Sequence, residues 1–226
     1  MSLNFILGQA KFDHRQEMIA QMRTSMTEHP DDQYFVIVPN HIKFNAEVGV
    51  LNALKQAMTD GNQTLYANGQ LQVFSFTRLA WYFMKNTPTY QLPRLSNAGL
   101  SMLIYHIIAD HQAEMTVFAG ELNQTGFINQ LVRQFSELKI GQVTAEDLQH
   151  IAGNLPTTEQ ADLGGKLHDL AIVYQAYTET LTGNYVDNAD LVSQLTDFLA
   201  HNDALTNAHI YLEGYATFSA QEQQLL

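Results

Sequence analysis

Residues 4–19, NFILGQAKFDHRQEMI, run from a short apolar segment through a glycine into a helix-compatible segment. In a phosphate-binding loop, G-x-x-x-x-G-K-[ST], glycine amides approach phosphate, the lysine reaches the terminal phosphates and the hydroxyl holds magnesium. Gly8 is kept, but the second glycine, the lysine and the hydroxyl are replaced by Asp13, His14 and Arg15. A carboxylate repels phosphate, and neither histidine nor arginine replaces the hydroxyl on magnesium. We therefore predict that the scaffold of the phosphate-binding loop is kept while its nucleotide chemistry is lost. The degenerate nucleotide-loop positions are Gly8, Lys11, Asp13, His14 and Arg15.

The elements that would position this loop alternate between strands and helices. After the strand at residues 4–7, Tyr34–Val38 (YFVIV) is typical of a strand covered on both faces. Residues 71–76 predict a third strand, with Thr77 as the cap of the next helix. Between these two strands, a helix over residues 44–58 is predicted to bury one stripe: Phe44, Val48, Leu51, Leu54 and Met58. Strands that alternate with helices predict a parallel sheet with right-handed crossovers.

From about residue 96 to about residue 198 the pattern changes. Amphipathic stripes at helical spacing recur there without a convincing strand, and loop signals such as Gly164-Gly165 separate them. Strand character returns at His209–Leu212, and Ser219 is predicted to cap a short final helix over residues 221–226. We therefore expect the first part of the chain to form a sheet, a helical block to be inserted next, and the last part of the chain to return to the same sheet.

Composition excludes several classes of function. The 226 residues are 46% hydrophobic and include no cysteine, which rules out thiolate metal sites, disulfides and a cysteine nucleophile in this stretch. The start lacks the pattern of a secretion signal, and no run of about 18 apolar residues is present. We expect a cytoplasmic protein with no membrane association.

The formal net charge of −12 disfavours autonomous binding to nucleic acid. If DNA is bound, another chain must contribute much of the positive surface. One stretch gathers both cations and aromatic residues: Arg78, Trp81, Tyr82, Lys85 and Arg94. It is either a local basic patch or a solvated helix edge over a core tryptophan.

Six words in this order resemble the N-terminal part of the B subunit of the AddAB/RexAB helicase-nuclease, the bacterial enzyme that processes double-strand DNA breaks. They are FILGQA, VIVPNHIKFNAE, VFSFTRLAW, FINQLVRQFSELK, KLHDLAIVYQAYTETL and IYLEGYATFSAQE. No single word is diagnostic, but six of them in the right order over the whole chain argue against coincidence. The absence of iron-sulfur cysteines and of a nuclease carboxylate motif fits a chain that lacks the family's C-terminal nuclease domain.

The resemblance implies an α/β fold of the P-loop NTPase, RecA-like type, with a large α-helical insertion. The expected domains are a RecA-like helicase domain over residues 1–94 and 206–226, and an insertion over residues 95–205. In this family the B subunit resembles a helicase with lost or reduced motor function that guides the nuclease strand and helps to recognise the Chi regulatory sequence. The departures at Asp13, His14 and Arg15 are consistent with the RexB branch.

The resemblance also directs attention to a second motor motif. A Walker B strand carries an aspartate that holds magnesium, usually followed by a glutamate that activates water. Here Glu213 takes the position of the metal-holding acid, and Gly214 follows it. We therefore expect no ATP hydrolysis, no catalytic residue and no bound metal in this chain, although the complete complex should need ATP and Mg²⁺. The structural alternative for Glu213 is a strand-end acid with a structural partner.

Two stretches match the motor family's single-strand contacts by position. Both lie at predicted carboxyl ends of parallel strands, where open α/β sheets bind ligands. With the neighbouring tryptophan, the candidate DNA-contacting residues are Asn40, His41, Lys43, Ser75, Thr77, Arg78 and Trp81. Their side chains suit phosphate contacts without base readout. The alternative is that Asn40 and Thr77 cap helices and that Ser75 is buried polar filler.

We therefore expect a noncatalytic helicase-like region of a DNA-repair and recombination complex, with the A subunit as partner in a heterodimer and DNA bound within the complex. The main alternative is a docking scaffold for the A subunit without DNA contacts. A second alternative is an HD-type metal phosphohydrolase built on His168-Asp169, with His106, His111 and His150 nearby in the sequence. Adjacent residues on a helix do not share a face, which favours a solvated or capping pair instead.

Overall fold

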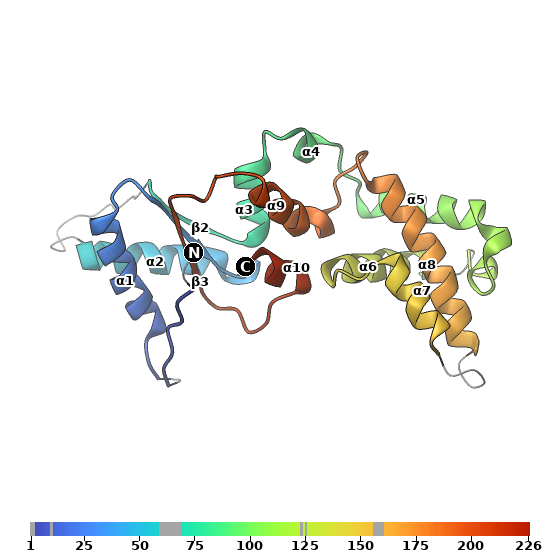
Figure 1. The fold of residues 1–226 in the computed structure, drawn as a ribbon, viewed down its shortest axis with the longest axis horizontal. Helices are drawn as coiled ribbons and strands as arrows, with labels where there is room; N and C mark the ends of the chain where they lie inside the picture. The colour runs from blue at the N-terminus through green and yellow to red at the C-terminus, as the bar shows by residue number, and fades with distance from the viewer. Residues whose placement is uncertain (1–2, 10, 59–68, 123, 125, 156–160) are drawn as a thin grey trace. The chain divides into compact units, whose positions relative to one another are not determined.

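The computed structural model describes residues 3–9, 11–58, 69–122, 124, 126–155 and 161–226 (Figure 1). The chain divides into two compact units. The sheet unit comprises Met1–Tyr82 and Leu199–Thr217, and the helical unit comprises Phe83–Phe198 and Phe218–Leu226.

The sheet unit is built on three parallel strands. Strand β1 (Gln33–Ile37) lies between β2 (Leu71–Phe74) and β3 (Ala208–Leu212), in the order β2-β1-β3. Ile37 is aligned with Phe74 on one side and with Leu212 on the other. The three carboxyl ends therefore meet at one edge of the sheet. This confirms the predicted α/β class with a parallel sheet.

Helices cover both faces of β1, as the unbroken apolar sequence of this strand predicts. Tyr34, Val36 and Val38 pack in one core with the buried residues of α1 (His14–Glu28) and α2 (Lys43–Met58). On the opposite face, the ring of Phe35 contacts the rings of Phe74 and Tyr82, and Tyr82 belongs to α3 (Phe76–Met84). Residues 34–38 are consequently all completely buried, whereas Gln33 at the start of the strand is exposed.

The predicted strand at residues 4–7 is wrong. Residues 3–9 have no regular secondary structure, and Leu3, Phe5 and Leu7 are 77%, 74% and 84% exposed. Only Ile6 packs against the core of the sheet unit. Apolar alternation indicates a strand, but a strand also needs a hydrogen-bonded neighbour, and this segment forms no ladder with the three described strands.

The predicted buried stripe of α2 is also partly wrong. Phe44 and Val48 are 77% and 45% exposed, whereas Ala46, Val50 and Leu54 are buried. Both sets have helical spacing, so periodicity alone does not choose between them. The helix turns its smaller residue, Ala46, towards the core, where α1 also packs. Small residues allow elements to approach closely, and the larger Phe44 is left outside.

The helical unit surrounds a core to which α5, α6, α7 and α8 contribute. Its elements are α4 (Pro88–Gln91), α5 (Asn97–Asp110), η2 (Gln112–Glu114), η3 (Phe118–Gly120), α6 (Phe127–Ile140), α7 (Ala145–Gly153), α8 (Ala161–Leu181), η4 (Asn188–Asp190), α9 (Leu191–Ala200, which crosses the unit boundary) and α10 (Ala220–Leu225). The sheet unit also contains the short helix η1 (Asn40–Ile42). The described part of this block contains no named strand, as predicted. Ser219 caps α10, also as predicted, and Glu222 completes a capping box.

The glycine pair Gly164-Gly165 lies inside α8 and is not the loop that the sequence predicts. A Cβ at Gly165 would come within 3.0 Å of Thr116 Oγ1 and 3.2 Å of Val117 Cγ2. The missing side chain lets residues 116–118 approach α8 closely. Glycine thus serves interhelix packing here, at a modest cost in helix propensity.

The finer fold and domain assignments stay predictions. A three-stranded parallel sheet is compatible with a P-loop NTPase of RecA-like type without defining one. The predicted domain division, residues 1–94 and 206–226 against 95–205, is not identical to the two compact units, because residues 83–94 and 218–226 cluster with the helical unit. Among the described residues, no helix is both long enough and apolar enough to cross a membrane.

Candidate functional site

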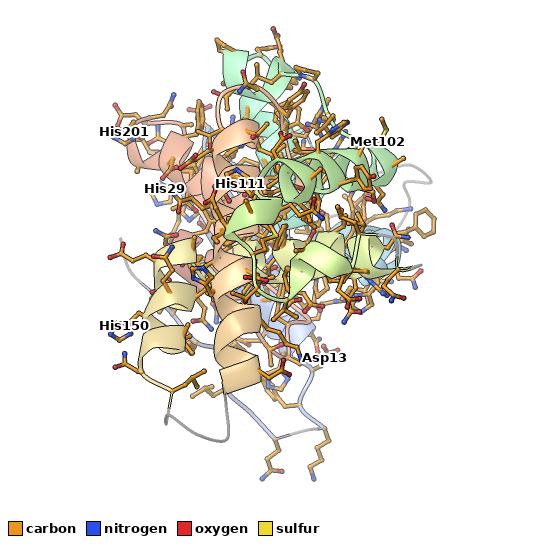
Figure 2. All side chains as sticks on the ribbon, turned by 90° about the vertical axis from the view of Figure 1, so that its right-hand side faces the viewer. Asp13, His29, Met102, His111, His150 and His201 are labelled. Carbon is orange, nitrogen blue, oxygen red and sulfur yellow. The ribbon has the colours of Figure 1, made fainter. Side chains whose placement is uncertain are left out.

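The N-terminus of α1 is occupied by a carboxylate of this chain. Asp13 is the N-cap of α1, and its Oδ1 accepts a hydrogen bond from the backbone N–H of Gln16 at 3.0 Å. Figure 2 labels Asp13 at the start of this helix. Free N–H groups and the helix dipole make such an end attractive to anions, phosphate included. Here Asp13 supplies the negative charge itself.

The other loop positions lie around this cap. Gly8, Lys11 and His14 are exposed, and the ring of Phe12 meets the ring of His14 edge-on at 5.1 Å. A Cβ at Gly8 would lie 2.7 Å from the ring of Phe12. The glycine is therefore used for packing against an aromatic side chain in this conformation.

Arg15, in the first turn of α1, contacts the acid at the end of β3. Its Nε donates a hydrogen bond to Oε1 of Glu213 at 2.7 Å, although the two residues are 198 positions apart in the sequence. The Glu213 backbone N–H donates to the carbonyl of Ile37 at 3.1 Å, which extends the ladder between β1 and β3. The degenerate loop and the Walker-B-like position are thus brought together, and they bind each other.

The ends of the three strands are also held together. A Cβ at Gly214 would lie 2.6 Å from Cδ1 of Ile42, and Gly214 has φ = +79°, so this position favours glycine for both space and backbone conformation. The rings of Phe76 and Tyr215 lie 5.5 Å apart. The segment after β3 therefore packs on the segments that follow β1 and β2.

The candidate DNA-contacting residues lie at this edge, and the structure differentiates among them. Asn40, His41, Thr77 and Arg78 are exposed, Lys43 and Trp81 are half-buried, and Ser75 is buried. The guanidinium of Arg78 lies 3.7 Å from the centroid of the Trp81 ring. Such a stacked pair presents a cation beside an aromatic surface, which is the combination that single-stranded nucleic acid uses.

The structure shows a different helix cap from the two, Asn40 and Thr77, that the sequence suggests. Oγ of Ser75 accepts a hydrogen bond from the backbone N–H of Arg78, so Ser75 is the residue that caps α3. Thr77 lies inside that helix, and the N-cap of η1 is Pro39, with no side-chain cap bond there. Neither Asn40 nor Thr77 is therefore a cap, contrary to the structural alternative. The local basic patch predicted from the sequence is divided between the two units. Arg78 and Trp81 belong to the sheet unit, whereas Lys85 and Arg94 belong to the helical unit.

The metal phosphohydrolase alternative does not fit the geometry of its two central residues. His168 is exposed, whereas Asp169 is fully buried. Oδ2 of Asp169 accepts hydrogen bonds from the backbone N–H groups of Val117 and Phe118 at 2.6 and 2.8 Å. Asp169 thus caps a backbone turn, as the capping interpretation predicts. The labelled histidines lie on separate elements in Figure 2, and the described residues contain no group of three or more potential ligands.

Sequence reasoning missed a linear Asp-His-Ser contact in the sheet unit. Nε2 of His209 lies 2.9 Å from Oδ2 of Asp32, and Nδ1 lies 3.3 Å from Oγ of Ser25. Ser25 is near the carboxyl end of α1, where the free backbone groups are carbonyls that repel an oxyanion. The His209 ring is also stacked on Tyr34 at 4.7 Å. The arrangement is a structural link between α1, β1 and β3.

The helical unit contains a cavity of about 440 Å³ beside a buried ionic cluster. Lys139 Nζ donates to Asp190 at 2.6 Å and to Asp187 at 3.3 Å, and the hydroxyl of Tyr177 donates to Asp187 at 3.0 Å. Burial raises the pKa of Asp190, and burial with the nearby carboxylates raises the pKa of Tyr174 to about 12. The ammonium pairs with both aspartates, and the cluster is part of the packing of the helical unit.

The structure defines an α/β class of protein with a three-stranded parallel sheet, whose candidate polar residues follow the carboxyl ends of the strands. Within that class, the family model described as "ADDB, N-terminal" matches residues 5–226, and the chain belongs to this family. Curated relatives are named as the B subunit of an ATP-dependent helicase/deoxyribonuclease. Those from Levilactobacillus brevis, Latilactobacillus sakei and Lactiplantibacillus plantarum are 53%, 48% and 48% identical, over 100% of this chain. The chain spans 19%, 18% and 18% of their respective lengths.

Proposed function

We propose that this chain is the noncatalytic, helicase-like N-terminal region of a B subunit that helps to process DNA double-strand breaks for recombination repair. It guides DNA within a cytoplasmic heterodimer with an A subunit, in a helicase-exonuclease that needs ATP and Mg²⁺. The fold is proposed to be a RecA-like P-loop domain with a helical insertion. Membership of the ADDB family supports this proposal.

The noncatalytic part of the proposal is supported by the loop itself. Magnesium-nucleotide needs free helix N–H groups, a lysine and a hydroxyl near an acid. Here Asp13 caps α1, and Arg15 contacts Glu213. The side chains at these positions do not fit a magnesium-nucleotide, so ATP is proposed to be bound elsewhere in the complex.

The observation that carries the DNA-guiding part is the exposed set at the carboxyl edge of the sheet. Asn40 and His41 follow β1, while Thr77 and Arg78 follow β2, and the register of the two strands places both groups at one edge. Hydroxyl, amide and guanidinium groups bind phosphate oxygens. Arg78, stacked on Trp81, offers a planar guanidinium on which an unstacked base can stack.

The test is site-specific crosslinking of single-stranded DNA in the assembled complex, with photoreactive residues at Asn40 and Thr77. We expect crosslinks at both positions, and we expect Arg78→Ala to weaken them about tenfold at physiological salt. Lys166→Ala is the matched control, because Lys166 is an exposed cation on α8 that pairs with Asp162. Its effect should be small.

The same experiment separates DNA guidance from the alternative, a docking scaffold without DNA contacts. Both predict that the chain copurifies with the A subunit. An assembled complex that crosslinks DNA elsewhere, but at neither Asn40 nor Thr77, would establish the scaffold and reject guidance by this edge.

A further inference from the structure

Three positions that would serve a magnesium-nucleotide carry side chains that contact other groups of this chain. In an active loop the hydroxyl position and the Walker B acid converge on one metal ion, and the helix N-terminus receives phosphate. In this chain those positions are Arg15, Glu213 and the end of α1 capped by Asp13. The following inference rests on the helicase-like fold of the proposed function.

We propose that Arg15 is a built-in replacement for the metal ion and Asp13 for the phosphate, so that α1 is fastened to the end of β3 without nucleotide. The guanidinium supplies the positive charge that Glu213 requires, and the Asp13 carboxylate supplies the negative charge at the helix end. Each charge is balanced inside the sheet unit. The arrangement is an internal tether between two segments that a motor would join through its ligand.

Both partners of the tether are fixed by their surroundings. Glu213 is held by its backbone bond to β1, and its side chain is only 21% exposed. Among the described residues, its second oxygen, Oε2, is buried without a hydrogen-bond partner. Removal of Arg15 would therefore leave a carboxylate that is poorly solvated and uncompensated.

Gly49 of α2 provides the space for the arginine. A Cβ at Gly49 would lie 2.5 Å from Nη1 of Arg15, a separation that requires the guanidinium to move. A glycine inside a helix normally destabilises it relative to alanine. The packing of Arg15 therefore explains the glycine at position 49. A side chain introduced there would displace Arg15 without changing the charge of Arg15 or of Glu213.

The first test is thermal unfolding of the 226-residue chain as Arg15→Ala, Glu213→Gln and the double variant. We expect Arg15→Ala to lower Tm by about 2–4 °C, a modest shift because the arginine is 37% exposed. The double variant should unfold at a higher temperature than Arg15→Ala, since glutamine removes the uncompensated charge. Additive Tm changes would overturn the tether. The exposed pair Lys166 and Asp162 is the control and should be additive.

The second test uses Gly49→Ala, whose effect on Tm should depend on the background. Alanine gains helix propensity in both backgrounds, but in the natural chain it also displaces the guanidinium from Glu213, so Tm should change less favourably there than in Arg15→Ala. Gly164→Ala in α8 is the control, because its Cβ would meet only ordinary contact at 3.9 Å, and it should raise Tm equally in both backgrounds. Equal Tm changes for Gly49→Ala in both backgrounds would contradict the inference.

Failure of the tether is distinguishable from failure of the proposed function. Absent DNA crosslinks would reject guidance and leave the Tm coupling untouched. Saturable binding of Mg-ATP by the natural chain, competing with the Arg15–Glu213 contact, would overturn the replacement of the metal ion. Additive Tm changes with intact crosslinks would reject the tether alone.

Discussion

At the scale of single residues, Asp169 shows how a buried charge is accommodated. Its carboxylate accepts backbone hydrogen bonds from Thr116, Val117 and Phe118, and a side-chain bond from Thr116. Burial by itself raises the pKa of this carboxyl, but the hydrogen bonds outweigh burial and hold the pKa below its usual value. The charged form is thus stabilised by donors that belong to one turn of backbone.

We expect Asp169→Asn to destabilise the chain by about 3 kcal/mol at pH 7. Several charge-assisted hydrogen bonds become neutral, and the NH₂ group of the asparagine faces backbone N–H donors where it needs an acceptor. The folded pKa is lowered, so the contribution is fully present above the unfolded value of about 4 and is lost as the pH falls through the folded pKa. Urea unfolding from pH 7 to pH 3 should therefore show the two proteins converging at acid pH.

Asp162→Asn is the control for that series, because Asp162 is on the same helix and exposed beside Lys166. It should change the free energy of unfolding only slightly. A constant difference between Asp169→Asn and the natural chain at every pH would show that packing, and not the charge, stabilises the turn.

At the scale of elements, α10 is fastened to the helical unit by one buried side chain. The amide nitrogen of Gln221 donates to the backbone carbonyls of Lys139 and Ala189 at 2.8 and 2.7 Å. Lys139 lies in the last turn of α6 beside Asp187 and Asp190, so the same residue anchors α10 through its carbonyl and η4 through its ammonium. The ionic cluster and the amide bridge therefore share α6 and η4.

We expect Gln221→Ala to lower the free energy of unfolding by about 1–2 kcal/mol, since the carbonyls of Lys139 and Ala189 each lose a donor, while the Lys139 carbonyl keeps the bond from the Gln142 backbone N–H. Amide hydrogen exchange should show faster exchange in α10 than in α5 of the same variant. Gln223→Ala is the matched control, because Gln223 is exposed and bonds only to the nearby carbonyl of Phe218. Equal protection of α10 in both variants would contradict the anchoring role of Gln221.

At the scale of the whole molecule, charge limits what the chain can bind alone. The net charge of −12 opposes a polyanion, although Arg78 and its neighbours form a locally suitable edge. Phosphate contacts supply most nonspecific affinity for DNA, and 11 lysines and arginines are outnumbered by 23 acids. The proposed guidance of DNA therefore requires positive surface from another chain.

We expect no DNA binding by the isolated chain at about 0.15 M salt in a mobility-shift assay up to tens of micromolar, and crosslinking only in the assembled complex. Micromolar binding by the chain alone would show that the local edge suffices.

Calorimetric titration of the same preparation with Mg-ATP should likewise give no heat of binding. The triple variant Asp13→Gly, His14→Lys and Arg15→Thr restores the pattern of a phosphate-binding loop. It tests whether the side chains at these three positions alone prevent the binding of Mg-ATP.

The sequence by itself determined the features that depend on neighbouring residues. These include the buried strand at Tyr34–Val38, the return of a strand at His209 and the Ser219 cap. Apolar runs, caps and motif spacing act within a few residues, so their physical causes are visible in the chain itself. The wrong choices, the strand at residues 4–7 and the stripe through Phe44, came from patterns that need a partner surface.

Only the tertiary structure decided which distant groups meet. Arg15 and Glu213 are 198 positions apart, and Asp169 lies 53 positions from Thr116, so no local spacing predicts either contact. Parallel pairing of β1 with β3 brings Glu213 to the edge, and the first turn of α1 brings Arg15 there. These groups meet because the fold places their elements side by side: the first turn of α1 lies at the end of β3, and residues 116–118 pack on α8.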